Sequence, residues 1–133
     1  MDADYHVQLI VPAEAGSARL ARLVAAALAA DANFTIDDTE DLRVAVSELV
    51  ALLVEGAEDL GDTLRLGFHR NETSVEVTGA RDLPSSESPA AGNSNAAPDD
   101  LALEILRVVV DEHKFEHTEL GREFRLLKRA RSG

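Results

Sequence analysis

The order in which strand-like and helix-like segments follow one another constrains this chain more than any other feature. Segments in which polar and apolar residues alternate predict strands, and segments in which apolar residues recur every three or four positions predict helices. The resulting order is strand, helix, helix, strand, strand, loop, helix, strand, strand, and no strand–helix–strand unit repeats. We therefore expect an α+β fold: a two-layer sandwich of a mixed, mostly antiparallel sheet with three helices on one face.

The segments behind this order have recognisable boundaries. Five alternating segments are predicted strands: 6–11, 63–69, 73–78, 113–117 and 122–128. Three segments with helical periodicity are predicted helices: 17–30, 37–54 and 99–111. We expect Ser17 to cap the first helix, because short polar side chains bind the free N–H groups at a helix start. The cap of the second helix is predicted among Asp37, Asp38 and Thr39.

Each predicted helix carries an apolar stripe that we expect to face the sheet. In the first helix the stripe consists of Leu20, Leu23, Val24, Ala27 and Leu28. In the second helix it consists of Leu42, Ala45, Val46, Leu49 and Leu53. In the third helix it consists of Leu101, Ile105, Val108 and Val109. The core is thus predicted to be aliphatic, and with 4% aromatic residues the chain is not expected to stack on nucleic-acid bases.

The apolar pattern stops between Gly79 and about Pro98, where Pro, Ser, Asn and Gly dominate. This composition predicts a flexible loop or lid over residues 79–98. The length of the chain suits one core, so residues 1–133 are predicted to form a single domain. The basic tail from Lys128 to Arg131 is predicted to be a frayed end.

Charge and composition argue against several kinds of function. The net charge of −12 opposes binding to nucleic-acid phosphates, and the absence of cysteine excludes disulfides and thiolate metal sites. The first four residues include two aspartates and no basic residue, although a signal peptide needs a basic start. The apolar run 23–30 is too short to cross a bilayer. We expect a soluble, cytoplasmic protein whose partners include neither nucleic acid nor membrane.

Two local motifs resemble a known family. Residues 41–50 read DLRVAVSELV, and residues 108–112 read VVVDE, followed at 121–126 by GREFRL. They are similar to the second helix and the closing segments of the anti-sigma-factor serine kinases, which share the Bergerat (GHKL) ATPase fold with gyrases and histidine kinases. The element order matches that family over residues 5–129. The resemblance implies an ATP-binding sandwich whose nucleotide-binding motifs are largely substituted here.

The family's second helix carries a glutamate that acts as a catalytic base or orients the attacking group. Four residues later it carries an asparagine that holds Mg²⁺. The resemblance places Glu48 and Leu52 at these positions. Residues four apart lie on one side of a helix, but Leu52 has no oxygen to offer a hard cation. Glu48 is therefore a candidate catalytic and nucleotide-binding residue without its metal-binding companion. The alternative is an acidic residue at the edge of an amphipathic helix.

The other nucleotide motifs of the family are also substituted. Its adenine-binding aspartate and the two following glycines correspond to Gly79, Arg81 and Leu83. Its phosphate-binding glycine pair corresponds to Asp100 and Ala102, and an aspartate at a helix N-terminus repels a triphosphate. We therefore expect no cofactor, and MgATP or MgADP only if the site still works.

Two further groups of residues are candidate sites. Arg19 and Arg22 lie three residues apart on one side of the first helix, and the resemblance assigns partner contacts to the position of Arg22. The alternative is two solvated arginines. His113 and His117 share one strand face and His69 lies on another strand, but without a cysteine or a convincing third ligand no metal site is predicted.

The retained scaffold and the substituted motifs together favour a protein-binding function. The leading hypothesis is an anti-sigma factor-like regulator that binds and sequesters an RNA polymerase sigma factor, is released by an antagonist (anti-anti-sigma) protein and forms a homodimer. The alternative is an ATP-dependent serine kinase that phosphorylates an anti-anti-sigma factor, favoured by Glu48 and opposed by Leu52 and Asp100. A third hypothesis is a domain that binds another small ligand in the former nucleotide cleft.

Overall fold

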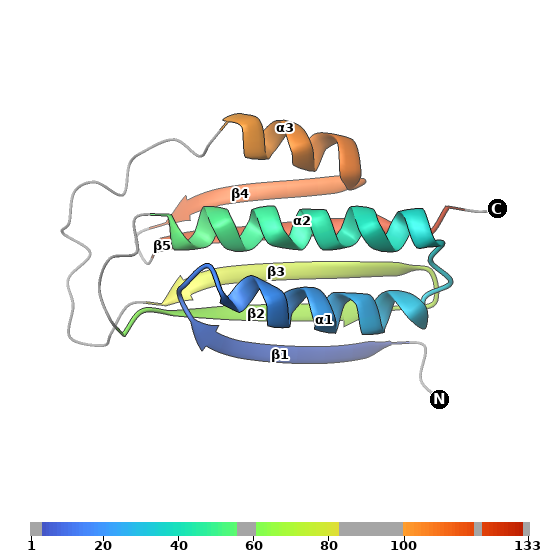
Figure 1. Cartoon of the computed structure of the whole chain (residues 1–133), viewed down its shortest axis with the longest axis horizontal. Helices are drawn as coiled ribbons and strands as arrows, with labels where there is room; N and C mark the ends of the chain where they lie inside the picture. The colour runs from blue at the N-terminus through green and yellow to red at the C-terminus, as the bar shows by residue number, and fades with distance from the viewer. Residues whose placement is uncertain (1–3, 56–60, 83–99, 119–120, 132–133) are drawn as a thin grey trace.

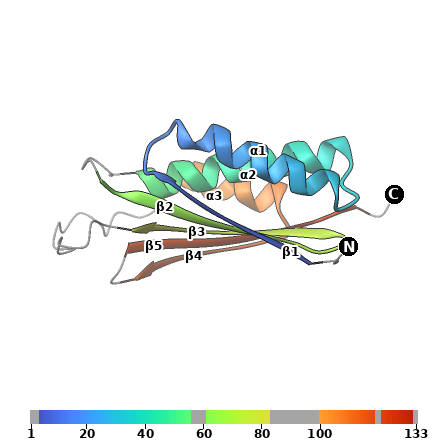
Figure 2. The ribbon, with the colours of Figure 1, turned by 90° about the horizontal axis from the view of Figure 1, so that it is seen from below.

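The chain folds into two layers, a five-stranded sheet and three helices that cover one of its faces (Figures 1 and 2). The computed structural model describes residues 4–55, 61–82, 100–118 and 121–131. The strands are β1 (Tyr5–Pro12), β2 (Thr63–Arg70), β3 (Ser74–Asp82), β4 (Glu112–Thr118) and β5 (Gly121–Arg129). The helices are α1 (Ser17–Ala30), α2 (Ile36–Val54) and α3 (Asp100–Val109).

The sheet has the order β1-β2-β3-β5-β4, and every strand pairing among the described residues is antiparallel. β1 pairs with β2 across two intervening helices, whereas β3 and β5 pair across α3 and β4. Figure 2 shows all three helices on the same side of the sheet, while its other face is open. The predicted α+β sandwich is confirmed.

The core lies between the two layers and is aliphatic. Along β2, Leu64, Leu66 and Phe68 are fully buried, while the residues between them line the open face of the sheet. α2 contributes every residue of its predicted stripe, each with no exposed surface: Leu42, Ala45, Val46, Leu49 and Leu53. Burying each leucine stabilises the fold by about 2 kcal/mol. α2 lies between α1 and α3 and packs against both, so it is the central helix of the helical layer (Figure 1).

α2 begins one residue earlier than predicted, and its cap is Thr35. The Thr35 hydroxyl accepts a hydrogen bond from the backbone N–H of Asp38 at 3.0 Å, and the Asp38 carboxylate accepts one from the backbone N–H of Thr35 at 3.2 Å. This reciprocal capping box satisfies two donors that a helix start leaves free. The prediction of a cap at Asp37, Asp38 or Thr39 is therefore wrong, although Asp38 takes part as the third helical residue.

α1 packs through its small residues. Its buried residues are Ser17, Ala21, Ala25, Leu28 and Ala29. The predicted stripe is wrong at Leu20 and Leu23, which are 46% and 62% exposed, and at Ala27, which is also exposed. The helix packs instead through its other alanines, whose small side chains allow it to approach its neighbours closely. The predicted cap is also displaced: Gly16 is the cap, and the Ser17 hydroxyl donates to the backbone oxygen of Pro12 at 2.7 Å.

α3 is likewise rotated relative to its prediction. Ala102 and Leu106 are buried, whereas Leu101 and Val108, predicted to face inward, are 66% and 80% exposed. As in α1, the buried side includes an alanine, and the small side chain of Ala102 suits close packing of α3 against α2. None of the described helices is both long and apolar enough to cross a membrane.

The predicted loop begins too early. β3 continues through Gly79 to Asp82, and in this stretch Gly79 pairs with Leu66 of β2 and with Phe124 of β5. Gly79 has no side chain that could continue the alternating pattern, so the sequence predicts that the strand ends before it. Residues 83–98, the remainder of the predicted loop, lie outside the described residues.

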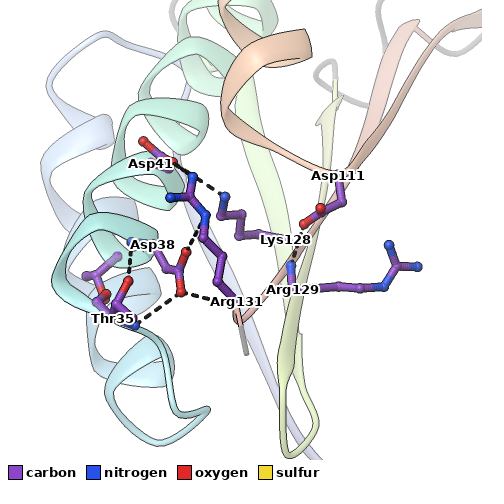
Figure 3. A network of polar contacts seen from close by, with 8 residues as sticks. Thr35, Asp38, Asp41, Asp111, Lys128, Arg129 and Arg131 are labelled. Atoms are coloured by element: carbon purple, nitrogen blue, oxygen red, sulfur yellow. Dashed lines mark hydrogen bonds and ion pairs between the residues drawn. The ribbon is translucent and has the colours of Figure 1, made fainter. Parts of the chain in front are cut away.

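The basic tail is not a frayed end over its described part. Lys128 and Arg129 belong to β5, and the backbone N–H of Arg129 donates to the Asp111 carboxylate at 2.7 Å. Arg131 follows the strand and binds the carboxylates of Asp38 and Asp41 (Figure 3). The last described residues are thus tied to the start of α2.

Candidate functional site

Glu48 and Leu52, on successive turns of α2, lie in different surroundings. Glu48 is half-buried, and within the described residues its carboxylate has no hydrogen bond or ion pair. Leu52 is 1% exposed and belongs to the core cluster. The acid expected from the sequence is therefore available to solvent, while the side chain one turn later is an apolar core residue.

Gly79 lies in β3 beneath α2, where three leucines fill the space in front of it. A Cβ atom at this position would lie 2.7 Å from Leu53 Cδ1, 3.1 Å from Leu66 Cδ2 and 3.4 Å from Leu49 Cδ2. The first distance is shorter than real Cβ contacts, so no side chain fits without displacing Leu53. The resemblance places an adenine-binding carboxylate at this position, and the packing leaves no room for one.

Arg81, two residues further along β3, turns toward the C-terminal end of α2. Its Nη1 donates to the backbone oxygens of Leu53 at 2.9 Å and of Glu55 at 2.8 Å, and its Nε lies 3.9 Å from the Asp62 carboxylate. Burial lowers the pKa of the Arg81 guanidinium, Asp62 opposes this shift, and the nearby Arg122 adds to it. An arginine remains charged under such conditions, so Arg81 is a buried cation bound to a helix end.

Arg122 joins Arg81 at the same helix end, and the sequence did not indicate it. Its Nη1 donates to the backbone oxygen of Leu52 at 2.8 Å and to the Glu55 carboxylate at 2.9 Å. Its guanidinium carbon lies 6.0 Å from the centre of the Phe115 ring. The available signal was its phase in β5, since Arg122 alternates in step with the buried Phe124 and points inward with it.

The predicted phosphate-binding positions lie at the start of α3. Asp100 is the first residue of this helix, but its side chain and the whole of Leu83 lie outside the described part of the chain. Ala102 is 4% exposed, and its methyl group belongs to the core. A buried methyl group at this position replaces the bare glycine backbone that cradles phosphates elsewhere.

These positions do not fit a magnesium nucleotide. Leu52 offers no metal ligand, the space before Gly79 is filled, and Arg81 is committed to backbone oxygens of α2. Over the described residues, no three His, Asp or Glu side chains form a group that could hold a metal ion. The cleft is occupied by the protein's own side chains at the described positions.

The two candidate arginines of α1 differ in their surroundings. Arg19 is exposed, whereas Arg22 is half-buried and its Nη1 donates to the Ser47 hydroxyl of α2 at 3.0 Å. Beside them, Leu20 and Leu23 expose apolar surface to solvent. We call Arg19, Leu20, Arg22 and Leu23 the α1 surface. It combines apolar area with two cations, which suits a protein contact better than a small-molecule site.

The histidines do not gather into one site. His69 of β2 lies opposite His6 of β1 with 6.0 Å between the ring centres, and its Nε2 is 3.8 Å from the Asp4 carboxylate. His113 stacks on Phe124, and the side chain of His117 lies outside the described residues. Among the described side chains, neither arrangement forms a group of three that could hold a metal ion.

A hollow of about 480 Å³ lies on the open face of the sheet, away from the α2 end just described. Its lining includes Gly67 and Thr78 and the cations Arg65, Lys114 and Arg125. Each of these cations has an acidic partner at the surface, as in the Arg65–Asp82 pair at 3.1 Å. We regard this face as a solvated surface with satisfied charges.

Comparison with known proteins agrees with the fold and the motifs. Residues 11–128 match the family model of the histidine kinase-like ATPase domain. The chain is 34% identical over 71 residues to the serine-protein kinase RsbW of Halalkalibacterium halodurans. This match covers 53% of the chain and 44% of the relative, so it spans less than half of the relative's length.

Proposed function

The chain belongs to the family of histidine kinase-like ATPase domains, and from this membership we propose that it is a protein-binding regulator of the anti-sigma type. In this proposal it binds and sequesters an RNA polymerase sigma factor, and an antagonist protein releases it. The similarity to a serine-protein kinase RsbW supports this class of regulator. The kinase activity in that name is not carried over, because the residues at the positions that the resemblance assigns to the nucleotide do not fit it.

The observation that carries the proposal is the filling of the nucleotide positions by the protein itself. Leu49, Leu53 and Leu66 occupy the space before Gly79, and Arg81 is bound to the end of α2. The chain thus keeps the scaffold of an ATPase domain while its cleft is used for internal packing. A scaffold kept without its ligand pocket is consistent with function through its surface.

The α1 surface is the proposed contact site. Leu20 and Leu23 offer apolar area to a partner, and burial of the half of each side chain that is still exposed contributes about 1 kcal/mol. Arg22, held in place by Ser47, and Arg19 suit carboxylates on that partner, because a guanidinium binds a carboxylate through two parallel hydrogen bonds. The expected partner surface therefore carries apolar and acidic residues side by side.

The proposed mode of regulation is competition between the two partners for one surface. If the sigma factor and the antagonist both bind the α1 surface, binding of one excludes the other, and the relative affinities decide which complex forms. A homodimer, implied by the sequence resemblance, would present two such surfaces. The proposal places the protein in the cytoplasm, the compartment in which both partners occur.

Binding of purified sigma factors tests the proposal. Each sigma factor of the source organism is titrated with the full chain by calorimetry. We expect one of them to bind, Leu23→Asp and Arg22→Ala each to weaken it at least tenfold, and Arg107→Ala to leave it unchanged. Arg107 is the matched control, because it is an exposed arginine on α3 paired only at the surface with Glu104. If no sigma factor binds, the proposal is wrong.

The second candidate function is an ATP-dependent serine kinase, and it has one observation in its favour. The Glu48 carboxylate is without a partner among the described residues, as a catalytic base would be before substrate binds. Calorimetry with MgATP and MgADP separates the two functions. Micromolar binding, together with phosphate transfer to an antagonist protein that Glu48→Gln abolishes, would replace the binding-only proposal.

A further inference from the structure

The C-terminal end of α2 is closed by side chains from two strands. A helix leaves its last four backbone oxygens without partners inside the helix. In α2, three oxygens in this region accept hydrogen bonds from arginines: Leu52 from Arg122, and Leu53 and Glu55 from Arg81. The helix has no basic residue of its own in its last turn, so the cations that suit its negative end come from β3 and β5.

The two arginines and Glu55 form one unit, which we call the arginine clamp. Glu55 connects the arginines, since its backbone oxygen accepts from Arg81 and its carboxylate from Arg122. The helix stops at this residue, whose ψ of 125° is no longer helical. The clamp therefore acts where the helical backbone ends, and it joins that end to two neighbouring strands of the sheet.

The clamp is buried and costly to assemble. The side chains of Arg81 and Arg122 are 12% and 5% exposed, and the two cations repel each other closely enough to affect the pKa of Arg81. Buried charges persist only where hydrogen bonds and opposite charges compensate them. Here the helix oxygens, Glu55 and Asp62 provide that compensation. A solvated surface arginine would need none of these partners.

The clamp also coincides with substituted nucleotide positions. Arg81 stands where the resemblance expects a glycine of the adenine-binding turn, and Leu52, whose oxygen binds Arg122, stands where it expects the Mg²⁺ ligand. The same stretch of α2 that would border a nucleotide is thus held by side chains. Residues that do not fit the family's nucleotide thus take part in holding this end of α2.

We propose that the arginine clamp is a built-in substitute for ligand at the end of α2, so that this helix end is ordered without nucleotide. The consequence for regulation rests on the proposed function: an α2 end that is ordered without nucleotide makes partner binding constitutive. The complex is then switched by competing proteins and not by ATP or ADP. Regulation by nucleotide would require the clamp to open, which means separating both guanidiniums from Leu52, Leu53 and Glu55.

Hydrogen–deuterium exchange on the free full-length protein tests the clamp. Arg81→Met and Arg122→Met keep the apolar stem but remove the donors. We expect the amides of residues 51–55 to exchange at least tenfold faster in each variant, while amides of β2 stay protected. Arg43→Met is the control, because Arg43 lies on the same helix in an exposed pair with Glu40. Unchanged exchange at 51–55, or an equal increase across the whole chain, would overturn the proposal.

A milder variant and a nucleotide arm complete the test. Glu55→Ala removes only the carboxylate, which is 44% exposed, so it keeps the protein folded and should accelerate exchange less than Arg122→Met. Adding MgATP or MgADP to the wild-type protein should leave exchange at 51–55 unchanged. Saturable protection by either nucleotide contradicts the clamp. Absence of any sigma-factor binding would refute the proposed function instead, and the exchange result on the free protein would stand independently of it.

Discussion

Arg131, just beyond the end of β5, binds Asp38 in the first turn of α2. Its backbone N–H donates to Oδ2 at 3.1 Å, and its Nε lies 3.2 Å from Oδ1 (Figure 3). Asp38 has no exposed surface, and its Oδ2 also accepts from the backbone N–H of Thr35. Asp41, one turn later, binds both Arg131 and Lys128 at 3.1 and 3.4 Å. The last strand is thus fastened to the start of the central helix.

Replacing Asp38 should destabilise the fold. Asp38→Ala removes half of the capping box and leaves the N–H groups of Thr35 and Arg131 without their acceptor, at an expected loss of about 2 kcal/mol in the free energy of unfolding. Urea denaturation at pH 7 measures it. Asp37→Ala is the control: this neighbour is exposed and affects only the helix dipole, at about 0.5 kcal/mol. Equal losses in the two variants would contradict the role of Asp38.

The contribution of Asp38 should depend on pH. Burial favours its neutral form, but hydrogen bonds from Arg131 and Thr35 and the charge of Lys128 outweigh burial and hold its pKa below the ordinary value. A carboxylate with a lowered folded-state pKa stabilises the protein above the unfolded pKa, and this stabilisation is lost as the pH falls through the folded pKa. The difference between wild type and Asp38→Ala should be constant from pH 6 to 8 and shrink below about pH 4. A difference that grew on acidification would disprove this assignment.

A single methyl group at Gly79 should be costly. The Cβ of Gly79→Ala would meet Leu53 Cδ1 at 2.7 Å, and relieving this contact by moving core leucines costs about 2 kcal/mol. Thermal denaturation should show a lower melting temperature than wild type. Gly16→Ala serves as control, because its nearest neighbour in space is 3.9 Å away. A neutral Gly79→Ala would mean that the space in front of β3 is open after all.

Restoring the family's asparagine should not restore a metal site. Leu52→Asn places an amide in a core position that is 1% exposed, at an expected cost of about 3 kcal/mol. Calorimetry should detect no binding of MgADP, because Gly79 and Arg81 still exclude the nucleotide. Val44→Asn, at a half-exposed position of the same helix, should change stability by less than about 0.5 kcal/mol. MgADP binding by Leu52→Asn would show that one residue alone disabled the site.

The order of elements and the stripe of α2 could be predicted because large apolar residues mark the periodic pattern of the segments and make up most of that stripe. The faces of α1 and α3 could not, since periodicity favours large side chains whereas the real contacts use Ala21, Ala25 and Ala102. An alanine carries little hydrophobic signal, yet it decides how closely a helix can approach its neighbours. Leu23 and Val108, for example, were predicted to face the sheet but are exposed.

The substituted nucleotide positions were predicted by residue type, but what replaces the ligand was not. No pattern along the sequence relates Arg81 and Arg122 to the end of α2, because the hydrogen bonds span 26 to 70 positions in the chain. The tail was misjudged for the same reason, since Arg131 finds Asp38 only after the sheet has formed. The phase of Arg122 in β5 indicates only that it points inward, whereas the partners of such long-range polar contacts depend on the assembled fold.

The pairing of β1 with β2 has a consequence for how the chain folds. It joins Tyr5 to Arg70, so nearly half of the chain, including α1 and α2, must be enclosed before these strands meet. Such non-local pairing makes folding slower than in a helical bundle, whose contacts are local. During synthesis β1 leaves the ribosome well before its partner exists, and its apolar side must remain unpaired until β2 follows. Completion of the sheet is therefore expected to set the pace at which the newly made protein becomes functional.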